Sequence, residues 1–489
     1  MKYRILVPNW IFYTFIFISF VVFFTLVHPI APYDGDDWYN IIIERPPYPS
    51  LDYWNPTKVF PECFEAFIAL LGAHLIVPLV SDYISGLIFA NAIIVSVFIV
   101  IYLLSVQRYI EFRFSITGLT IQGLMVVFIL LHFLILRTKN ECNEYLWYSN
   151  DANCYYHYII PNMLCSSLVL WLMRNDIRNE KNGRTIASLL VLTYLALCSN
   201  LYSVVIFISY IGAILVLDLS TSSFNNQKPR VWLKHYLHRN APYLVVIALW
   251  GIIQFIEAKG IRANCYGYLH KSLILCLKVT VYNFITIRYN LWFLGLSFLV
   301  LIGAKLLDYK LGKHRFWHIG NRQIVILLAA SLSIMYLILL SSRVDPIYIQ
   351  RGDVVFEYSF FLLLLVILAL AYLSTHIRYV SLATLLLIPF LLFQINTPGR
   401  TFKDVCEAYA PDLPNCIHID HEIVRQICDA DAAGMDSVVI SIPKYPNYEN
   451  WPVMSPRYAS QYYGRALYKH NQTKREIITI FIPSYEIDE

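Results

Sequence analysis

The stretch Pro32-Tyr33-Asp34-Gly35-Asp36-Asp37-Trp38-Tyr39 directly follows the first long apolar run of the chain. Its three carboxylates lie within four residues. They cannot lie in hydrocarbon, because a charged side chain at the centre of a bilayer costs at least about 2.5–3.5 kcal/mol. The stretch therefore belongs in water or in a polar cleft at a membrane surface, where its aromatic rings can be half buried. We interpret it as the candidate reaction centre.

The composition is that of a polytopic α-helical membrane protein. Of 489 residues, 58% are hydrophobic and only 15% are charged, whereas a soluble protein carries about 25% charged residues. The mean hydropathy is +0.54, and apolar runs long enough to cross a bilayer recur along the chain. A transmembrane β-barrel would instead show short strands of alternating polarity. The net charge of +5 is modest, so the placement of Lys and Arg matters more than their sum.

The chain opens on an apolar run, Trp10–His28, preceded by Lys2 and Arg4. This run is too long for a signal peptide, and no small-residue cleavage site follows it. We expect a retained first helix over about residues 10–30 with a cytoplasmic N-terminus. Residues 31–82 then form a long first external loop.

The orientation of the later helices depends on the apolar stretch Phe60–Val80. This stretch carries Glu62, Glu65 and His74, so it either spans the membrane or lies flat in the interface. If it spans, the following basic loops fall outside, against the positive-inside rule. A flat helix places them all in the cytoplasm and is favoured. Ser272–Arg288 is a second segment that is interfacial or only partly inserted.

The apolar run Ile186–Leu217 is too long for one span, at about 1.5 Å per residue against a core near 30 Å. We expect an external turn at Ser199-Asn200 between two short helices. With this division, residues 1–395 contain about eleven spans. An odd number of spans places the C-terminus opposite the N-terminus, on the extracytoplasmic side.

From Asn396 onward the composition is that of a soluble domain. Asp420–Gly434 reads as an amphipathic helix ended by a glycine. Ser437–Ile442 and Glu476–Ile482 read as strands. Residues 396–489 are therefore expected to form a small α/β extracytoplasmic domain.

The acidic residues Asp34, Asp36 and Asp37 are the candidate catalytic group. A base that deprotonates a hydroxyl needs a carboxylate held close to it, with a basicity tuned by burial or by a like charge. Of two adjacent carboxylates, one can act while the other orients it or binds a cation. The structural alternative is a solvated turn that caps the next helix. No CxxC or Cys/His metal spacing occurs, so no metal ligand set is predicted, although a divalent cation is compatible with the acidic pair.

Two external arginines, Arg343 and Arg351, are candidate phosphate-binding residues. A guanidinium at the membrane surface can grip a phosphate through two hydrogen bonds. The alternative is an arginine that reaches the lipid headgroups at the end of a span. Arg45 and His157 are weaker candidates for substrate binding.

The layout resembles the GT-C superfamily of integral membrane glycosyltransferases. Within it, the chain is most similar to bacterial enzymes that use polyprenyl-phosphate sugars, including the serotype-converting glucosyltransferases. The likeness covers the whole chain in layout: a first helix, an acidic external loop with flat helices, many spans and a small external domain. The residues that carry it are Asp36-Asp37-Trp38, Arg351, Arg425-Gln426-Ile427, Gly434, Val438-Val439-Ile440-Ser441-Ile442-Pro443 and Tyr462-Tyr463-Gly464.

This resemblance implies a protein of the bacterial inner (plasma) membrane that modifies a cell-surface polysaccharide such as O-antigen. Its donor is a sugar linked to polyprenyl phosphate, and its acceptor is a surface glycan. Asp36 or Asp37 acts as the base, the sugar carbon is inverted, and Arg351 stabilises the departing phosphate. The implied partners are these substrates and membrane lipids, with no nucleic acid and no required metal.

Two other classes remain open. A polymerase of O-antigen or capsule polysaccharide uses the same lipid-linked substrates, but usually has a large mid-chain external loop with arginines, whereas here the long external segments are the first loop and the tail. A lipid or sugar transporter would favour polar groups at mid-membrane and inverted repeats, and the sequence indicates neither.

Overall fold

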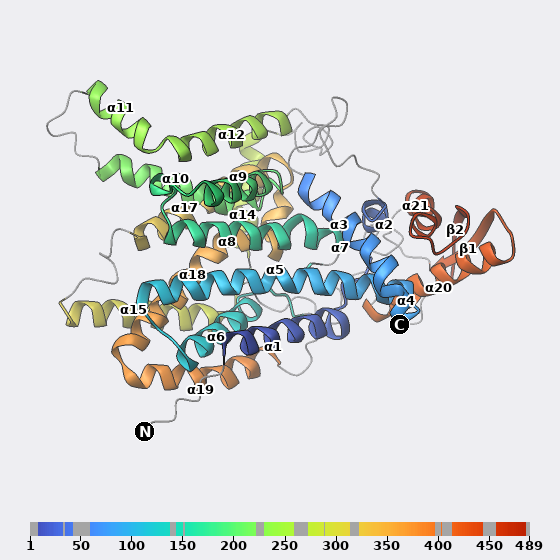
Figure 1. Ribbon diagram of the computed structural model, residues 1–489, viewed down its shortest axis with the longest axis horizontal. Helices are drawn as coiled ribbons and strands as arrows, with labels where there is room; N and C mark the ends of the chain where they lie inside the picture. Colours follow the sequence, from blue (N-terminus) through green and yellow to red (C-terminus); the bar gives the residue numbers. More distant parts are fainter. Residues whose placement is uncertain are drawn as a thin grey trace.

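The computed structural model of the chain describes residues 8–32, 35–42, 59–136, 143–149, 152–221, 229–258, 272–287, 289–312, 322–396, 402, 413–443 and 456–485. Apolar helices dominate the fold and lie side by side along one common direction, and a small domain with two strands stands at one end of this bundle (Figure 1). The prediction of a helical membrane-type bundle with a small sheet near the C-terminus is therefore confirmed.

The bundle is built from helices whose residues are apolar on nearly every side, as expected of segments surrounded by protein and lipid. Their bounds are α1 (Asn9–Val22), continued by the π-helical turn η1 (Phe23–Val27), α5 (Tyr83–Phe114), α6 (Leu119–Leu134), α8 (Ile160–Arg174), α9 (Gly183–Leu197), α10 (Val204–Thr221), α12 (Ala241–Glu257), α14 (Leu273–Ile285), α15 (Leu291–Lys310), α17 (Arg322–Arg343), α18 (Gly352–His376) and α19 (Arg378–Ile395). In the described part of the chain, six helices are long and apolar enough to cross a membrane.

A seventh candidate span is a bent pair, in which α11 (Pro229–Arg239) meets α12 at 78°. Five further apolar helices are only 10–17 residues long. Length and composition therefore support a multi-pass protein but do not by themselves establish the predicted number of about eleven spans.

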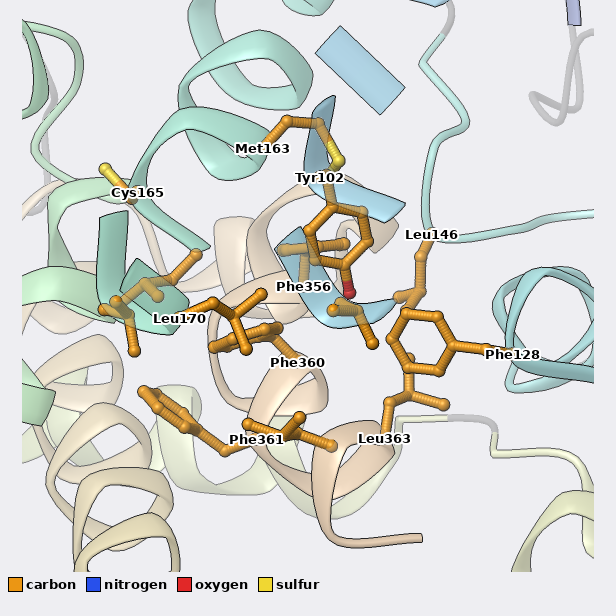
Figure 2. Packing of buried hydrophobic residues seen from close by; sticks show 14 of the residues in the cluster. Tyr102, Phe128, Leu146, Met163, Cys165, Leu170, Phe356, Phe360, Phe361 and Leu363 are labelled. Carbon is orange, nitrogen blue, oxygen red and sulfur yellow. The ribbon is translucent and has the colours of Figure 1, made fainter. Parts of the chain in front are cut away.

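Helix α18 forms the centre of the bundle, since 94% of its apolar window is buried. Phe356 and Phe360 both contact Tyr102 of α5, with ring centroids 6.1 Å apart in each pair. Figure 2 shows these rings packed in one cluster with Leu170 of α8. Large rings that are fully buried contribute much of the burial energy of such a core.

Basic residues gather at one end of the bundle. Helix α1 begins at the end that lies to the left in Figure 1, and the C-terminal domain stands at the opposite end. Helices α5, α8 and α15 end on the left in Figure 1 and α9 begins there. Basic residues lie in or beside these helix ends in the sequence: Arg108, Arg113, Arg174, Arg178, Lys181, Arg184, Lys305 and Lys310. This is the distribution expected if that end faces the cytoplasm.

The stretch predicted to lie flat forms α3 (Val59–Leu71), the π-helical turn η3 (Gly72–Ile76) and α4 (Val77–Val80). Its composition would allow it to span a membrane. In Figure 1, however, it runs obliquely across the end of the bundle instead of along it. Leu79 is 82% exposed, so this segment presents apolar surface outward at the end that carries the C-terminal domain.

The long apolar run around residue 200 is divided as predicted. Helix α9 ends at Leu197 and α10 begins at Val204. Between them, Oδ1 of Asn200 accepts the backbone N–H of Tyr202 at 2.8 Å, a local bond that favours a turn over a continuing helix. The predicted turn at Ser199-Asn200 is therefore confirmed, and its position outside the membrane stays a prediction.

The C-terminal domain contains α20 (Leu413–Ala432), β1 (Ser437–Pro443), α21 (Pro456–Lys469) and β2 (Ile478–Tyr485). The two strands pair in parallel, with Val439 opposite Ile480. The predicted helix and strands are confirmed, with boundaries shifted by up to several residues, whereas α21 was not predicted. A Cβ at Gly464 of α21 would lie 1.9 Å from the backbone oxygen of Ile477, so only glycine allows this helix to rest directly on the strand.

Candidate functional site

The acidic turn forms the short helix α2 (Gly35–Asn40), which packs against α21 of the C-terminal domain. The indole of Trp38 stacks on the ring of Tyr463, with centroids 3.8 Å apart. Nζ of Lys469 donates to the backbone oxygen of Ile42 at 3.0 Å. The acidic turn and the C-terminal domain therefore lie at the same end of the bundle, as the predicted topology requires.

Asp37 is completely buried, with 0% of its surface exposed. Its Oδ1 accepts the backbone N–H of Asn153 at 2.6 Å, and its Oδ2 accepts that of Ala152 at 3.3 Å. These two N–H groups open a continuous helical stretch formed by α7 (Ala152–Cys154), the π-helical turn η4 (Tyr155–Ile159) and α8. A carboxylate at a helix N-terminus is stabilised in its charged form by the free N–H groups and the helix dipole.

Asp36 differs from its neighbour because its side chain is half buried. Asp36 lies on the same short helix α2. The hydrogen bond of Asp37 and the ring contact of Trp38 hold this helix in place. Of the two adjacent aspartates, Asp36 is therefore the more exposed one. Asp34 and Arg45, the remaining candidates from the first loop, lie outside the described residues.

Arg351 precedes the first residue of α18 and is held in one orientation by Asp353 in the first turn. Its Nε donates to Oδ1 of Asp353 at 3.0 Å, and its Nη2 donates to Oδ2 at 2.6 Å. The guanidinium also lies over two rings, with its Cζ 4.8 Å from the centroid of Tyr158 and 5.3 Å from that of Tyr348. Its side chain is 34% exposed, and Nη1 meets no acceptor within the described ranges. One donor edge of this cation is therefore open to an anion.

The helix start at α7 brings the predicted acid and the predicted cation together. Asp37 binds the N–H groups of Ala152 and Asn153, and Nη2 of Arg351 lies 3.2 Å from Sγ of the next residue, Cys154. Three segments that are far apart in the sequence thus meet around one helical turn. The acidic turn and Arg351 therefore contact neighbouring residues of the same helix start.

The other predicted substrate-binding residues are less central. Arg343 is exposed at the last residue of α17, and the 3-10 helix η8 (Pro346–Gln350) separates it from Arg351. His157 is buried within η4. It lies one turn from Cys154 on the same helix, so it belongs to the surroundings of the site but presents no open surface to a substrate.

Asp420 of α20 is a site residue that the sequence analysis did not single out. Its Oδ1 accepts the hydroxyl of Tyr463 at 2.6 Å. Burial holds the pKa of Asp420 well above its usual range; the Tyr463 hydrogen bond opposes this shift and the negative charge of Asp37 adds to it. Asp37 and Asp420 therefore form an electrostatically linked pair across the contact between the acidic turn and the C-terminal domain. In the sequence, the burial of Asp420 is indicated only by its position on the same helix face as Ile423 and Ile427.

Three π-helical turns lie at this end of the bundle. They are η1, η3 and η4, and each interrupts or continues an otherwise regular helix. Such turns are rare and occur frequently at functional sites, because the extra residue redirects side chains. Their concentration around the acidic turn supports this end as the functional one.

Glu357 is a buried carboxyl group inside an apolar helix. Helix α18 begins at Gly352, and Glu357 lies in it with 0% of its surface exposed. The hydropathy of the sequence does not indicate this burial, because the neighbouring helices that bury the side chain are distant in the chain.

No three His, Cys, Asp or Glu side chains gather as a metal site in the part of the chain that the structure describes. The acidic turn therefore offers two carboxyl groups, and Arg351 offers a contact for an anion, while the described residues show no ligand set for the divalent cation that the acidic pair left open. A comparison with known protein families, with curated proteins and with solved structures finds no match to this chain.

Proposed function

We propose that the chain is a GT-C-type membrane glycosyltransferase that moves a sugar from a polyprenyl-phosphate donor to a surface glycan. The observation that carries this proposal is the meeting of the acidic turn and Arg351 around the first turn of one helix, beside an external domain. Transfer from a lipid phosphate needs a base for the acceptor and a cation for the leaving group. This end of the bundle supplies both.

In the proposed reaction, the carboxylate of Asp36 takes the proton of an acceptor hydroxyl. The acceptor oxygen then forms a bond to the anomeric carbon, and the bond from that carbon to the phosphate oxygen breaks with inversion. The negative charge released on the polyprenyl phosphate is stabilised by the open edge of Arg351. Asp37 positions the helix that carries Asp36, and Asp34 and Arg45 belong to the same loop.

The proposed membrane topology has eleven crossings: α1, α5, α6, α8, α9, α10, α12, α15, α17, α18 and α19. Short connections between consecutive crossings support it, such as those from Phe114 to Leu119 and from His376 to Arg378. The N-terminus is then cytoplasmic and the C-terminal domain extracytoplasmic, in the inner membrane of a bacterium. The basic end of the bundle supports this orientation.

The direct test is turnover of polyprenyl-phosphate sugars by the purified protein in lipid nanodiscs, with release of polyprenyl phosphate as the readout. Asp36→Asn is expected to lower kcat by about 10²-fold or more, as for the loss of a general base. Arg351→Lys keeps the charge but not the two-pronged contact with Asp353 and is expected to slow release of the phosphate. Glu422→Gln, on the exposed side of α20, is the control. Turnover that is unchanged in Asp36→Asn would remove the acidic turn from the mechanism.

Glu357 favours a second candidate function, a cation-coupled lipid or sugar transporter. An ionisable residue buried among membrane-type helices is characteristic of transport pathways. Reconstituted vesicles distinguish the two functions: a transporter moves intact substrate across the bilayer, whereas a transferase splits the donor without moving it. The inverted repeat typical of many transporters was not found in the sequence.

A further inference from the structure

The bundle contains a group of oxygen atoms that lack hydrogen-bond donors. Both carboxylate oxygens of Glu357 are buried and form no hydrogen bond with any described residue. The amide oxygen of Asn162 on α8 is likewise unpaired. The hydroxyls of Ser341, in the last turn of α17, and of Tyr202 lie close to each other and form no hydrogen bond with any other described residue. Each buried polar atom that is left unpaired costs about 1–3 kcal/mol, so a protein that keeps several of them together requires a partner for them.

These atoms come from helices that converge on one region. Nδ2 of Asn162 donates to the backbone oxygen of Asp353 at 2.8 Å, and Asp353 lies one helical turn before Glu357 on the same face of α18. Because helical side chains lean toward the N-terminus, the Glu357 carboxylate is directed toward this amide. Helix α17 packs against both α10 and α18, which brings Ser341 to the same side.

Tyr202, in the break between α9 and α10, is the fourth residue of this group. Its ring stacks on Tyr348, with centroids 5.2 Å apart, and its hydroxyl lies beside Ser341 and within electrostatic range of Glu357. Cys165 of α8 is also within electrostatic range of Glu357, and it lies at the margin of the aromatic cluster in Figure 2. The group therefore lies near the edge of the aromatic cluster that contains Cys165.

The charges around Glu357 do not balance if it is ionised. The nearest cation, Arg351, is already paired through two hydrogen bonds with Asp353. The three residues together then carry one uncompensated negative charge, and an isolated carboxylate in the interior is strongly disfavoured. One added positive charge would neutralise these three residues, whereas a divalent ion would leave them with a net positive charge.

We propose that Glu357, Asn162, Ser341 and Tyr202 form a binding site for one monovalent metal cation. The ligands are a carboxylate, an amide oxygen and two hydroxyls, which are hard oxygen donors of the kind that alkali-metal ions prefer over softer transition metals. The site lies about 9 Å below Arg351, given six residues at about 1.5 Å each. It does not depend on the proposed glycosyl transfer, because it rests only on the charges and unpaired oxygens of the bundle.

The experiment measures thermal unfolding of the full-length purified protein in NaCl, KCl or choline chloride at equal ionic strength. A cation that binds only the folded state raises the unfolding temperature in a saturable way. We expect Na⁺ or K⁺ to raise it by at least about 2 °C over choline. Glu357→Gln, which is nearly isosteric and neutral, is expected to abolish the ion-specific shift, whereas the control Glu422→Gln retains it.

Two further measurements cover the other outcomes. Ser341→Ala keeps the charge of Glu357 and is expected to raise the half-saturating cation concentration about tenfold, which tests the site even if Glu357→Gln does not fold. Binding of radioactive sodium to the parent protein reads the site directly. Equal unfolding temperatures in all three salts, together with an infrared band of a protonated carboxylic acid that disappears in Glu357→Gln, would overturn the proposal, because a proton would then supply the missing charge.

Discussion

Asp37 and Asn153 are 116 residues apart in the sequence, and Oδ1 of Asp37 accepts the backbone N–H of Asn153 at 2.6 Å. This bond ties the first external segment to the start of a helix in the middle of the chain. It separates the roles of the two adjacent aspartates, since Asp37 is buried in a structural contact and Asp36 is half exposed beside it. The difference leads to opposite expectations for the two residues.

Asp37→Ala is expected to destabilise the protein by about 1–3 kcal/mol, because it removes the acceptor of two helix N–H groups and leaves them buried and unpaired. Asp37→Asn keeps one acceptor oxygen but loses the charge at the helix N-terminus, and a smaller loss of about 1 kcal/mol follows. Asp36→Asn is the matched control, with an unfolding temperature close to that of the parent. Thermal unfolding in nanodiscs checks all three, and a stable Asp37→Ala would show that the contact does not hold the helix start.

Gly464→Ala is expected to disrupt the C-terminal domain. The added methyl carbon would meet the backbone oxygen of Ile477 at 1.9 Å. Ile477 directly precedes β2, and this backbone cannot move aside as the end of a flexible side chain can. We expect a loss of at least about 1–3 kcal/mol in the stability of this domain, read as faster hydrogen exchange in β2 and α21. Gly183→Ala is the control, because nothing lies within 4 Å of its Cβ. Equal exchange in both variants would contradict the close packing of α21 on the strand.

Asp420 gives the contact between the domain and the bundle a pH dependence. Burial first, and the charge of Asp37 second, raise the pKa of Asp420 in the folded protein, against the smaller opposing effect of Tyr463. The folded state therefore holds its proton more tightly than the unfolded chain, whose aspartates titrate near about 3.9. This contribution to stability is fully present below that pH and is lost as the pH rises through the folded pKa.

Asp420→Asn stays neutral at every pH and keeps an acceptor for the Tyr463 hydroxyl. It is expected to be more stable than the parent at neutral pH, with a flatter dependence on pH above about 4. Hydrogen exchange of α20 between pH 4 and 8 measures this, after correction for the intrinsic exchange rate. If the parent and Asp420→Asn show the same pH profile, Asp420 does not carry the effect.

His470 affects stability in the opposite direction. Burial lowers the pKa of His470 to about 4, against a backbone hydrogen bond to Ile41. Its contribution to stability is therefore lost as the pH falls from about 6.5.

Local patterns in the sequence were sufficient for features that depend on neighbouring residues. The helix break beside Asn200 follows from the length of an apolar run and a side chain that bonds its own backbone. The strands of the C-terminal domain follow from runs of β-branched residues, and the grouping of the acidic turn with that domain follows from the placement of Lys and Arg.

Features that depend on contacts between distant segments could not be predicted. Nothing near Asp37 indicates that its partners are the N–H groups of a helix that begins at Ala152. Asp420 looked like an ordinary residue of an amphipathic helix until its burial against Tyr463 was seen. The complete burial of Glu357 cannot be seen in the hydropathy of its own segment, because the helices that surround it come from other parts of the chain.

The proposed topology predicts that the two ends of the bundle are reached from opposite sides of the membrane. Asp436 is 87% exposed in the C-terminal domain, and Arg184 is exposed in the first turn of α9 at the basic end. In intact cells, a thiol reagent that cannot cross the inner membrane is expected to label Asp436→Cys but not Arg184→Cys, each compared with the parent chain and its own cysteines. After the membrane is permeabilised, both variants should react. Labelling of Arg184→Cys alone in intact cells would invert the scheme, because Asp36 would then lie in the cytoplasm, where a surface glycan cannot reach it.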